Sequence, residues 1–485
     1  MPKGVVMFTP IAIVVTVLNF LAIIAMIFIE RKKPEIIISW LLLFSLFPIL
    51  GFVFYVLIGS GLSVKTKKML RRKKFYNDNY VNYYHQLINN ERDIKNQKAY
   101  ELVKYNMLAA ASVPTFGNSV KIFTNGYDKI DALVQDIQNA KHSINIEYYI
   151  IGDDAIGRRV MDALIQKAKQ GVAVNLIYDS VGSLKTKRKF FRPLKAAGGH
   201  VKEFFPPLFY IRLINLKMNY RNHRKIVVID GKIGYVGGIN IRADHCGENP
   251  CLSPWQDTHI RVEGQAVYTL QNEFLNFWQF CNKENIETNK YIELGYFPDI
   301  GKVGETAIQT ITSGPDETKH EIKQNMLKIF QVAKEEVIIE TPYFVPDEIF
   351  MNSIKMAIQS GVKFKLIIPG KPDKKFVYHA TLSFAKEFVD MGGELYIFNG
   401  FMHAKTLTVD DFALTIGTAN ADNRSFSLNF EINAVLYDAA LNKEYRTHLE
   451  EVMKCSKKVD AEYFNQKSWW VKFKQLFFRL FAPLF

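Results

Sequence analysis

The stretch AKHSINIEYYIIGDDAIGRRVMDALIQKAKQGVAVNLIYD (residues 140–179) returns in altered form as AKEEVIIETPYFVPDEIFMNSIKMAIQSGVKFKLIIPG (residues 333–370). Each copy reads as an apolar strand, a loop, an amphipathic helix, a glycine at 171 or 361 and a second apolar strand. Strands that alternate with helices, and that are apolar along almost their whole length, predict a parallel or mixed sheet covered on both faces. The sequence therefore predicts an α/β fold of two similar units, each a mixed sheet flanked by helices.

A shorter repeat follows each copy, as RNHRKIVVIDG (residues 221–231) and GFMHAKTLTVDD (residues 400–411). In both, a His and a Lys two residues apart precede an apolar run. Residues two apart on a strand point to the same face, so His223 and Lys225 project to one side, as do His403 and Lys405. One His-x-Lys pair is common by chance, but two matched copies predict that both pairs belong to one chemical site.

Further polar residues recur at matched positions after these two segments. After each apolar run the chain turns, and the return strand ends in Gly-x-x-Asn, which offers Asn240 and Asn420 as donors to a bound anion. Asp257 in PWQDTHIRV and Glu431 in NFEINAVLY are candidates to accept the Nδ1–H of a histidine and so fix its tautomer.

Asp230 and Asp410 lie five residues after the Lys of each repeat. They are candidate catalytic residues by their place in the repeat. Their position in a turn, and their odd spacing from the Lys, favour a supporting role instead.

This set of side chains suits the transfer of a phosphodiester. Lys and Asn donors stabilise the charge that develops on the phosphoryl oxygens, one imidazole attacks phosphorus, and the other protonates the leaving alcohol. An incoming hydroxyl then reverses the sequence, which predicts net retention at phosphorus and a bell-shaped pH profile. No carboxylate cluster with metal-ligand spacing accompanies the histidines, so we expect neither a metal nor another cofactor.

Both ends of the chain carry signs of a membrane. Val5–Ile29 and Ile36–Ile58 are 25 and 23 residues long and contain no charge, and a helix needs roughly 20 apolar residues to cross a bilayer. They predict a transmembrane helical hairpin within residues 1–60. Seven Lys or Arg residues within 65–74 favour a cytoplasmic side for the domain that follows.

The last residues, 465–485, combine large aromatic side chains with Lys472, Lys474 and Arg479. This pattern predicts an amphipathic helix on the membrane surface, and an ordinary core helix is the alternative.

The net charge of +14 is unevenly distributed. Residues 1–74 hold 11 Lys or Arg and 2 Asp or Glu, and residues 467–485 hold 4 Lys or Arg and no acid. The rest of the chain is nearly balanced, with 47 Lys or Arg and 46 Asp or Glu. The excess therefore lies beside the apolar segments, where anionic lipids attract it, whereas a nucleic-acid-binding body should itself be basic. The four cysteines (246, 251, 281 and 455) form no disulfide framework, and with His245 and His259 they match no common zinc spacing.

HRKIVVID and HAKTLTVD match the His-x-Lys-(x)4-Asp motif of the phospholipase D superfamily. Over nearly its whole length the chain resembles the bacterial cardiolipin synthases, in ERKKPEIIISWLLLFSLFPILGFVFYVLIG, EYYII, TPYFVPDE, GTANADNRSF and the FRLFAPLF ending. The resemblance implies two pseudo-symmetric phospholipase D-like units, 116–295 and 296–464, behind a basic juxtamembrane segment, 61–115. Thr418 stands where Ser is commoner, and the loop ADHCGENPCLSPWQD departs from the family pattern.

The resemblance also implies an activity at the bacterial cell membrane: transfer of a phosphatidyl group from one phosphatidylglycerol to another, giving cardiolipin and glycerol through a phosphohistidine. The six motif residues would share one site, with His223 as the usual nucleophile and His403 as the acid. Phosphatidylglycerol and other anionic lipids are the expected partners, nucleic acid is not, and a homo-oligomer is left open. The alternatives are a phospholipase D-type hydrolase or a transferase with a different alcohol acceptor, then a nuclease, and a catalytically silent membrane scaffold.

Overall fold

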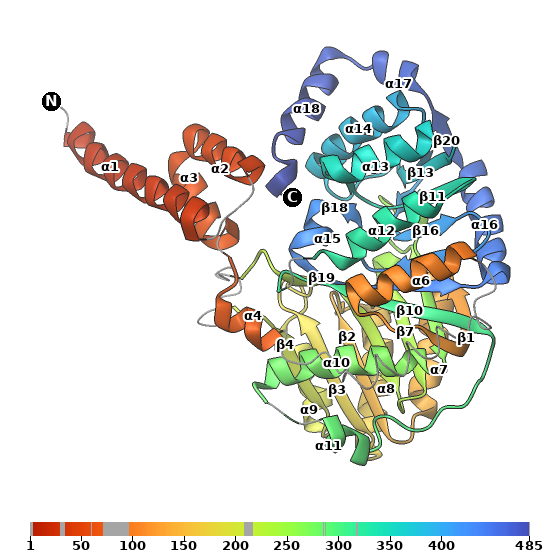
Figure 1. Cartoon of the computed structure of the whole chain (residues 1–485). Coiled ribbons are helices and arrows are strands. Elements are labelled where there is room, and N and C mark those ends of the chain that lie inside the picture. The colour runs from red at the N-terminus through yellow and green to blue at the C-terminus, as the bar shows by residue number, and fades with distance from the viewer. Residues whose placement is uncertain are drawn as a thin grey trace.

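Both repeats contribute strands to one continuous sheet. The computed structural model describes residues 3–29, 34–59, 61–70, 97–207, 217–284, 286, 288–316 and 319–484. Within these, a 16-stranded sheet runs in the order β20-β14-β13-β11-β16-β17-β19-β10-β1-β9-β7-β6-β2-β3-β4, with β5 beside β19 (Figure 1). The two units meet where β10 (Thr306–Ser313) pairs antiparallel with β1 (Thr115–Phe123). The predicted α/β class, with a mixed sheet flanked by helices, is confirmed.

The first unit has helices on both faces of its sheet. β2, β3 and β4 are parallel, whereas β6, β7 and β9 are antiparallel to their neighbours. α7 and α8 pack on one face, and α10 packs on the other. The elements are α7 (Gly126–Asn139), β2 (Ser143–Tyr148), α8 (Ala155–Lys169), β3 (Ala173–Asp179), α9 (Arg192–Ala196), β4 (His200–Phe204), β6 (Lys225–Ile229), β7 (Ile233–Gly237), β9 (His259–Glu263) and α10 (Ala266–Asn282).

The second unit repeats this plan. β11, β13 and β14 are parallel, and β16, β17 and β19 form the antiparallel part. α12, α13 and α14 contribute to the core on one face, and α16 to the core on the other. The elements are α12 (Glu321–Val332), β11 (Glu336–Glu340), α13 (Glu348–Gln359), β13 (Lys363–Pro369), α14 (Lys375–Asp390), β14 (Glu394–Phe398), β16 (Thr406–Val409), β17 (Ala413–Gly417), β19 (Asn429–Tyr437), α16 (Ala439–Lys454) and β20 (Ser456–Val459).

The repeated helices begin and end where the sequence indicates. The side chains of Asp154 and Asp347 cap α8 and α13 by accepting from the amides of Gly157 and Phe350. Gly171 and Gly361 follow these helices with φ of +86° and +94°, a backbone conformation that glycine adopts without steric cost. Each helix thus ends in a tight turn into the next parallel strand.

The N-terminal apolar segments differ from the expected pair of continuous spans. α1 (Lys3–Ile24) covers most of the first, but the second divides into α2 (Pro34–Leu46) and α3 (Pro48–Phe54). The division lies at Phe47, with φ −140° and ψ 72°, because Pro48 lacks an N–H and disfavours helical backbone at the residue before it. None of the helices in the described part of the chain combines the length and apolar character needed to cross a membrane.

Two helices of the predicted juxtamembrane segment, 61–115, lie in its described residues, 61–70 and 97–115, and they pack against different units. α4 (Val64–Leu70) contacts α10 of the first unit, and residues 71–96 lie outside the described part of the chain. α6 (Gln97–Ala110) packs against α12, and its Ala99 and Leu102 join the core of the second unit. Residues 97–110 are therefore part of the core of the second unit.

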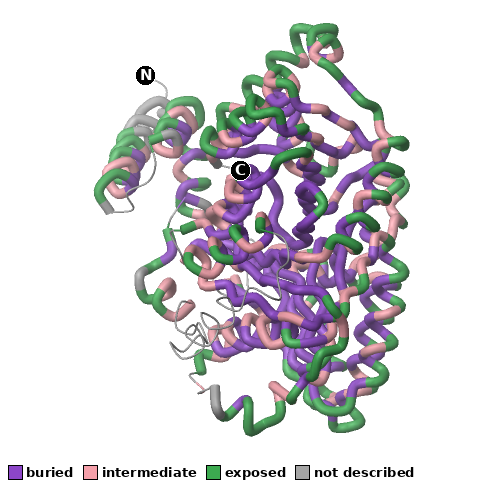
Figure 2. The backbone as a smooth tube through the Cα atoms, turned by 45° about the vertical axis from the view of Figure 1, so that its right-hand side comes forward, coloured by how far each residue is buried: buried purple, intermediate pink, exposed green. Residues whose placement is uncertain are grey.

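The C-terminal helix α18 (Trp469–Arg479) lies along α14. Its Trp469 and Trp470 are each 64% exposed. Ser39 of α2 donates to the carbonyl oxygen of Leu480 at 3.3 Å, which joins the two ends of the chain. Figure 2 shows the buried strands at the centre and exposed surface along the N-terminal helices.

Candidate active site

Two short strand pairs carry each histidine into contact with the other unit. β5 (Arg221–Asn222) pairs in parallel with the start of β19, and β15 (Phe401–Met402) pairs in the same way with β8 (Trp255–Gln256). The amide of His223 then donates to Phe430 O at 3.0 Å, and that of His403 to Gln256 O at 2.6 Å. Each histidine therefore lies beside the strand that carries the acid of the opposite unit.

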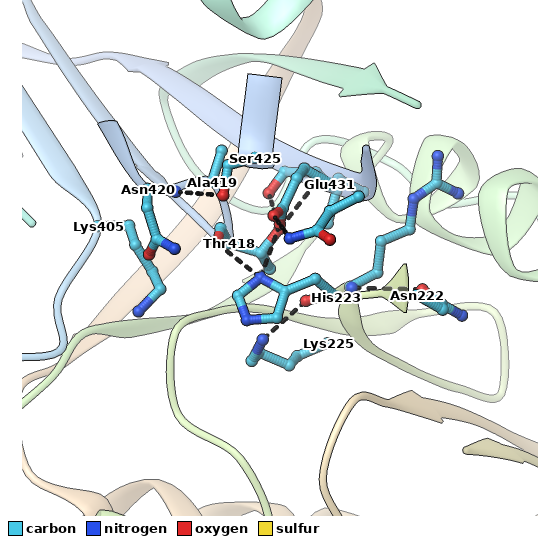
Figure 3. Close-up of polar contacts among 12 residues, drawn as sticks. Asn222, His223, Lys225, Lys405, Thr418, Ala419, Asn420, Ser425 and Glu431 are labelled. Carbon is cyan, nitrogen blue, oxygen red and sulfur yellow. Dashed lines mark hydrogen bonds and ion pairs between the residues drawn. The ribbon is translucent and has the colours of Figure 1, made fainter. Parts of the chain in front are cut away.

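Each imidazole is hydrogen-bonded to a carboxylate from the other unit. His223 Nδ1 lies 2.9 Å from Glu431 Oε2, and His403 Nδ1 lies 2.6 Å from Asp257 Oδ2 (the first pair is drawn in Figure 3). Thr418 adds its backbone oxygen at 3.1 Å from His223 Nδ1 and donates its hydroxyl to Glu431 at 2.6 Å. With Nδ1–H donated to a carboxylate, Nε2 of each ring is left as the lone-pair nitrogen that can attack or accept a proton.

Burial keeps both imidazoles neutral. It lowers the pKa of His223 to about 4, with Glu431 opposing the shift and Lys225 adding to it. Burial, followed by the charge of Lys405, lowers the pKa of His403 well below its ordinary value. Burial would raise the pKa of Asp257, but His403 and hydrogen bonds from His245 and His403 hold it below its ordinary value. At neutral pH the site thus contains two neutral imidazoles and two ionised carboxylates.

Lys225 and Lys405 lie beside the imidazoles as buried cations. Lys225 Nζ donates to the backbone oxygen of His223 at 2.7 Å, and Lys405 Nζ makes the equivalent bond to His403. Figure 3 shows both ammonium groups near the ring of His223. Burial lowers the pKa of Lys225 to about 7 and that of Lys405 to about 8, so both titrate near physiological pH.

The motif aspartates lie at the far ends of their strands, away from the imidazoles. Asp230 accepts from the backbone amides of Lys141, His142 and Ser143 at 2.7–2.9 Å. Asp410 accepts in the same way from residues 334, 335 and 336, and from Lys98 at 2.9 Å. Both have positive φ, 52° and 44°. The turn directs each carboxylate to the amides that begin β2 or β11, as the supporting role indicated by their turn position requires. A part for Asp230 and Asp410 in the chemistry stays a prediction.

Asn240 and Asn420 line the central cavity, as expected of phosphate donors. However, Asn420 Nδ2 donates to Asp422 at 3.1 Å, and Asn240 Nδ2 lies 3.0 Å from His245 Nε2. Contact of these two amides with a phosphate stays a prediction.

His245 is a functional candidate that the sequence reasoning did not place. Only 4% of this residue is exposed, and its Nδ1 lies 3.3 Å from the Asp257 oxygen that His403 also contacts. The donor atoms of His245, Asp257 and His403 lie within 4.8 Å of one another, a geometry that could hold a metal among the described residues. His245 lies in the loop ADHCGENPCLSPWQD. The departure of this loop from the family pattern was the feature of the sequence that could have pointed to His245.

The two units enclose a cavity of about 580 Å³ between them. His223 and His403 both line it, and so do Arg221, Arg424, Trp255 and Phe401. These four neighbours were not singled out from the sequence. The pairing of β5 with β19 and of β15 with β8 brings Arg221, Trp255 and Phe401 to the cavity, and Arg424 lies on α15 (Asn423–Ser427).

Comparison with known proteins matches both units to one family. The family model described as "Cardiolipin synthase, PLD-like domain" matches residues 133–278 and 326–453. A second model, "Phospholipase_D-nuclease N-terminal", matches residues 17–60. Together these matches cover the repeats, the two His-x-Lys segments and the N-terminal apolar region.

Several relatives are similar along almost the whole chain. The "Major cardiolipin synthase ClsA" of Bacillus subtilis (strain 168) is 40% identical over 481 residues, 96% of this chain and 97% of that protein. A "Cardiolipin synthase" of Staphylococcus aureus (strain Mu50) is 38% identical over 485 residues, 96% and 95% of the two chains. The crystal structure of a phosphatidylserine synthase from Haemophilus influenzae Rd KW20 superposes with a TM-score of 0.62 and 14% identity, covering 79% of this chain and 100% of that one, so the fold is shared.

Proposed function

The chain belongs to the family of bacterial cardiolipin synthases with phospholipase D-like domains, and from that membership we propose that it transfers a phosphatidyl group from one phosphatidylglycerol molecule to the hydroxyl of a second. The products are cardiolipin and glycerol. The observation that carries the proposal is the pair of histidine–carboxylate hydrogen bonds, one from each unit, at a single cavity.

The first step forms a phosphohistidine. Nε2 of one imidazole attacks phosphorus, and the bond from phosphorus to the glycerol oxygen breaks. The other imidazole gives a proton to that oxygen. It takes up this proton when the phosphodiester binds, because a negative charge beside the ring raises its pKa. The carboxylate on each Nδ1–H stabilises positive charge on its ring. Lys225 and Lys405 supply the cations that stabilise charge on the phosphoryl oxygens.

The second step returns the histidines to their starting states. The hydroxyl of the second phosphatidylglycerol gives its proton to the acid–base imidazole and attacks phosphorus, and the bond from phosphorus to the nucleophilic histidine breaks. Two in-line displacements give net retention at phosphorus. His223, Lys225, His403 and Lys405 carry the chemistry, Asp257 and Glu431 orient the rings, and Asn240 and Asn420 are proposed phosphate donors.

Hydrolysis is the alternative, because water and an alcohol compete for the same phosphohistidine. The deciding experiment incubates the purified full chain with labelled phosphatidylglycerol in vesicles and separates the lipids. We expect labelled cardiolipin and an equal amount of glycerol. Phosphatidic acid without cardiolipin would replace the synthase with a phospholipase, and turnover only with another added alcohol would replace it with a different transferase.

We further propose that residues 1–60 anchor the chain in the membrane as a multi-pass segment, and that α18 lies on the membrane surface with the catalytic body on the cytoplasmic side. Exposed apolar side chains on the N-terminal helices support this: Phe20 is 62%, Phe28 72% and Leu50 57% exposed. Such a surface is costly in water. Protease digestion of sealed vesicles tests the orientation. If the catalytic domain is cytoplasmic, it should be cleaved in vesicles whose cytoplasmic side faces outward and protected in vesicles of the opposite orientation.

A further inference from the structure

The two ends of the cavity differ at positions that the repeat makes equivalent. Arg221 pairs with Asn429 across β5 and β19, just as Phe401 pairs with Trp255 across β15 and β8. In each pair, the first residue precedes a catalytic histidine by two, and the second precedes its orienting acid by two. The His223 end therefore presents a guanidinium and an amide where the His403 end presents two aromatic rings.

A second pair of equivalent positions increases this difference. Arg424 follows Asn420 by four residues, and Asp244 follows Asn240 by four. All four of these residues line the cavity. The His223 end thus has a second guanidinium where the His403 end has a carboxylate, which is itself paired with Arg242 at 2.8 Å.

The two guanidinium groups retain capacity for an anion. Arg424 donates from both Nη atoms to Asn219, a neutral residue, at 2.8 Å each, and no ion pair between described residues includes it. Arg221 pairs with Asp179 at 3.2 Å, but that carboxylate also accepts from three backbone amides. The other contacts of the Arg221 guanidinium are to neutral oxygens, the Lys217 carbonyl and the Ser180 hydroxyl. Arg221 Nε and Asn429 Oδ1 are buried without a hydrogen-bond partner in the described part of the chain. Two other acids line the cavity: Asp422 is bonded to Ser425 and Asn420, and Asp373 accepts from the Tyr343 hydroxyl.

We propose that Arg221 and Arg424 form a subsite for a second phosphate, the one carried by the acceptor alcohol. This inference rests on the proposed function. The reacting phosphate lies between the two imidazoles and the two lysines, whereas an acceptor phosphatidylglycerol brings a further phosphodiester anion that loses water when it enters the cavity. A guanidinium matches two phosphate oxygens at once, which an ammonium does not. Glycerol, the leaving alcohol, has no phosphate and makes no use of the subsite.

The subsite distinguishes two histidines that the repeat makes nearly equivalent. In an in-line displacement the nucleophile and the alcohol lie on opposite sides of phosphorus, and the acid–base group lies with the alcohol. An acceptor phosphate held beside His223 therefore makes His223 the acid and base, and makes His403 the nucleophile. This order is the reverse of the one implied by the family resemblance.

The test uses two soluble acceptors that differ by one phosphate, glycerol and glycerol 3-phosphate. The soluble acceptor carries the label and phosphatidylglycerol in mixed micelles is the donor, because transfer to glycerol regenerates phosphatidylglycerol. The proteins are the full-length wild type, Arg424→Gln and, as a matched control that removes a cation from the opposite end of the cavity, Arg242→Gln. We expect the wild type to prefer glycerol 3-phosphate in kcat/KM. Arg424→Gln should reduce this preference about 10- to 100-fold, the size expected for one charge-assisted phosphate contact. Arg242→Gln should keep the preference for glycerol 3-phosphate.

Each other result counts against the subsite in a recognisable way. A wild type that makes cardiolipin but does not prefer glycerol 3-phosphate overturns the subsite and leaves the proposed function intact, whereas a wild type that does not consume phosphatidylglycerol overturns both. If Arg424→Gln does not fold, Arg424→Lys keeps the charge but loses the two-oxygen geometry and should reduce the preference by a smaller factor; an unchanged preference overturns the subsite. Peptide mapping of a rapidly quenched reaction should find the phosphatidyl group on His403, and its presence on His223 would overturn the acceptor's position.

Discussion

His223 of the first unit and Glu431 of the second are joined by a hydrogen bond of 2.9 Å, although 208 residues separate them in the chain. His403 and Asp257 form the reciprocal bond at 2.6 Å. Neither unit therefore supplies the carboxylate for the histidine of its own His-x-Lys pair, and the catalytic chemistry requires both units in register. The parallel pairing of β5 with β19 and of β15 with β8 sets that register.

Replacing the orienting acids by amides should lower turnover without removing the nucleophile. Glu431→Gln and Asp257→Asn keep the side-chain shape but lose the charge that fixes the tautomer and stabilises the imidazolium. We expect kcat for cardiolipin formation to fall by about 10²- to 10⁴-fold in each variant. Initial rates with labelled phosphatidylglycerol measure the effect, and unchanged circular dichroism is the control. A loss below about threefold would mean that the carboxylates do not assist the histidines.

Replacement of either histidine should abolish turnover but leave the protein in the membrane. His223→Ala and His403→Ala each remove one of the two groups that exchange a bond or a proton with the substrate, so we expect no detectable cardiolipin. Flotation with vesicles checks that each variant still inserts. A His223→Ala protein with wild-type turnover would exclude His223 from the chemistry altogether.

The motif aspartates should affect stability more than chemistry. Asp230→Ala leaves three backbone amides at the start of β2 without their carboxylate, and Asp410→Ala does the same at β11. A loss of about 2 to 4 kcal/mol in the free energy of unfolding is expected for each. Thermal unfolding measures it, and the residual folded enzyme at low temperature should keep most of its kcat. A normal melting temperature with absent turnover would instead support a direct catalytic role.

The pH profile of kcat/KM should follow the buried lysines on its alkaline side. With pKa values lowered to about 7 and about 8, Lys225 and Lys405 lose their protons as pH rises through that range, and with them the charge that stabilises the phosphoryl oxygens. On the acid side, activity should fall as the nucleophilic imidazole becomes protonated. In the order that the phosphate subsite implies, this is His403, whose pKa burial lowers well below its ordinary value. Rates from pH 4 to 10 in constant ionic strength check this profile. In Lys225→Arg the onset of the alkaline limb should move to higher pH, because Lys225 has the lower pKa of the two and a guanidinium stays protonated; an unmoved limb would assign it to another group.

The exposed tryptophans of α18 should contact lipid. Trp469 and Trp470 are each 64% exposed, and Leu476 beside them is 63% exposed. Vesicles with brominated acyl chains should quench part of the intrinsic fluorescence of the reconstituted protein, and Trp469→Phe with Trp470→Phe should remove that part. Equal fractional quenching in the wild type and the double variant would place α18 outside the membrane surface.

Local sequence determined a large part of this molecule. The alternation of apolar strands with amphipathic helices predicts the mixed sheet and its helical layers, because burial on both faces requires that periodicity. The duplicated His-x-Lys spacing predicts which imidazoles and ammonium groups act together, because residues two apart on a strand share a face. The turn position of Asp230 and Asp410 indicated their supporting role, although not the amides that they bind.

The tertiary structure decided how these parts combine. Which carboxylate bonds to which histidine depends on the pairing of strands from the two units. The residues of each bonded pair lie more than 140 residues apart in the chain, and no local pattern encodes that pairing. The same pairing places Arg221 at one end of the cavity and Trp255 and Phe401 at the other. The position of α6 in the second unit likewise depends on packing. Sequence thus determined the elements and the reactive groups, and the tertiary structure decided their partners, because long-range contacts are selected by the fit of whole surfaces and not by neighbours in the chain.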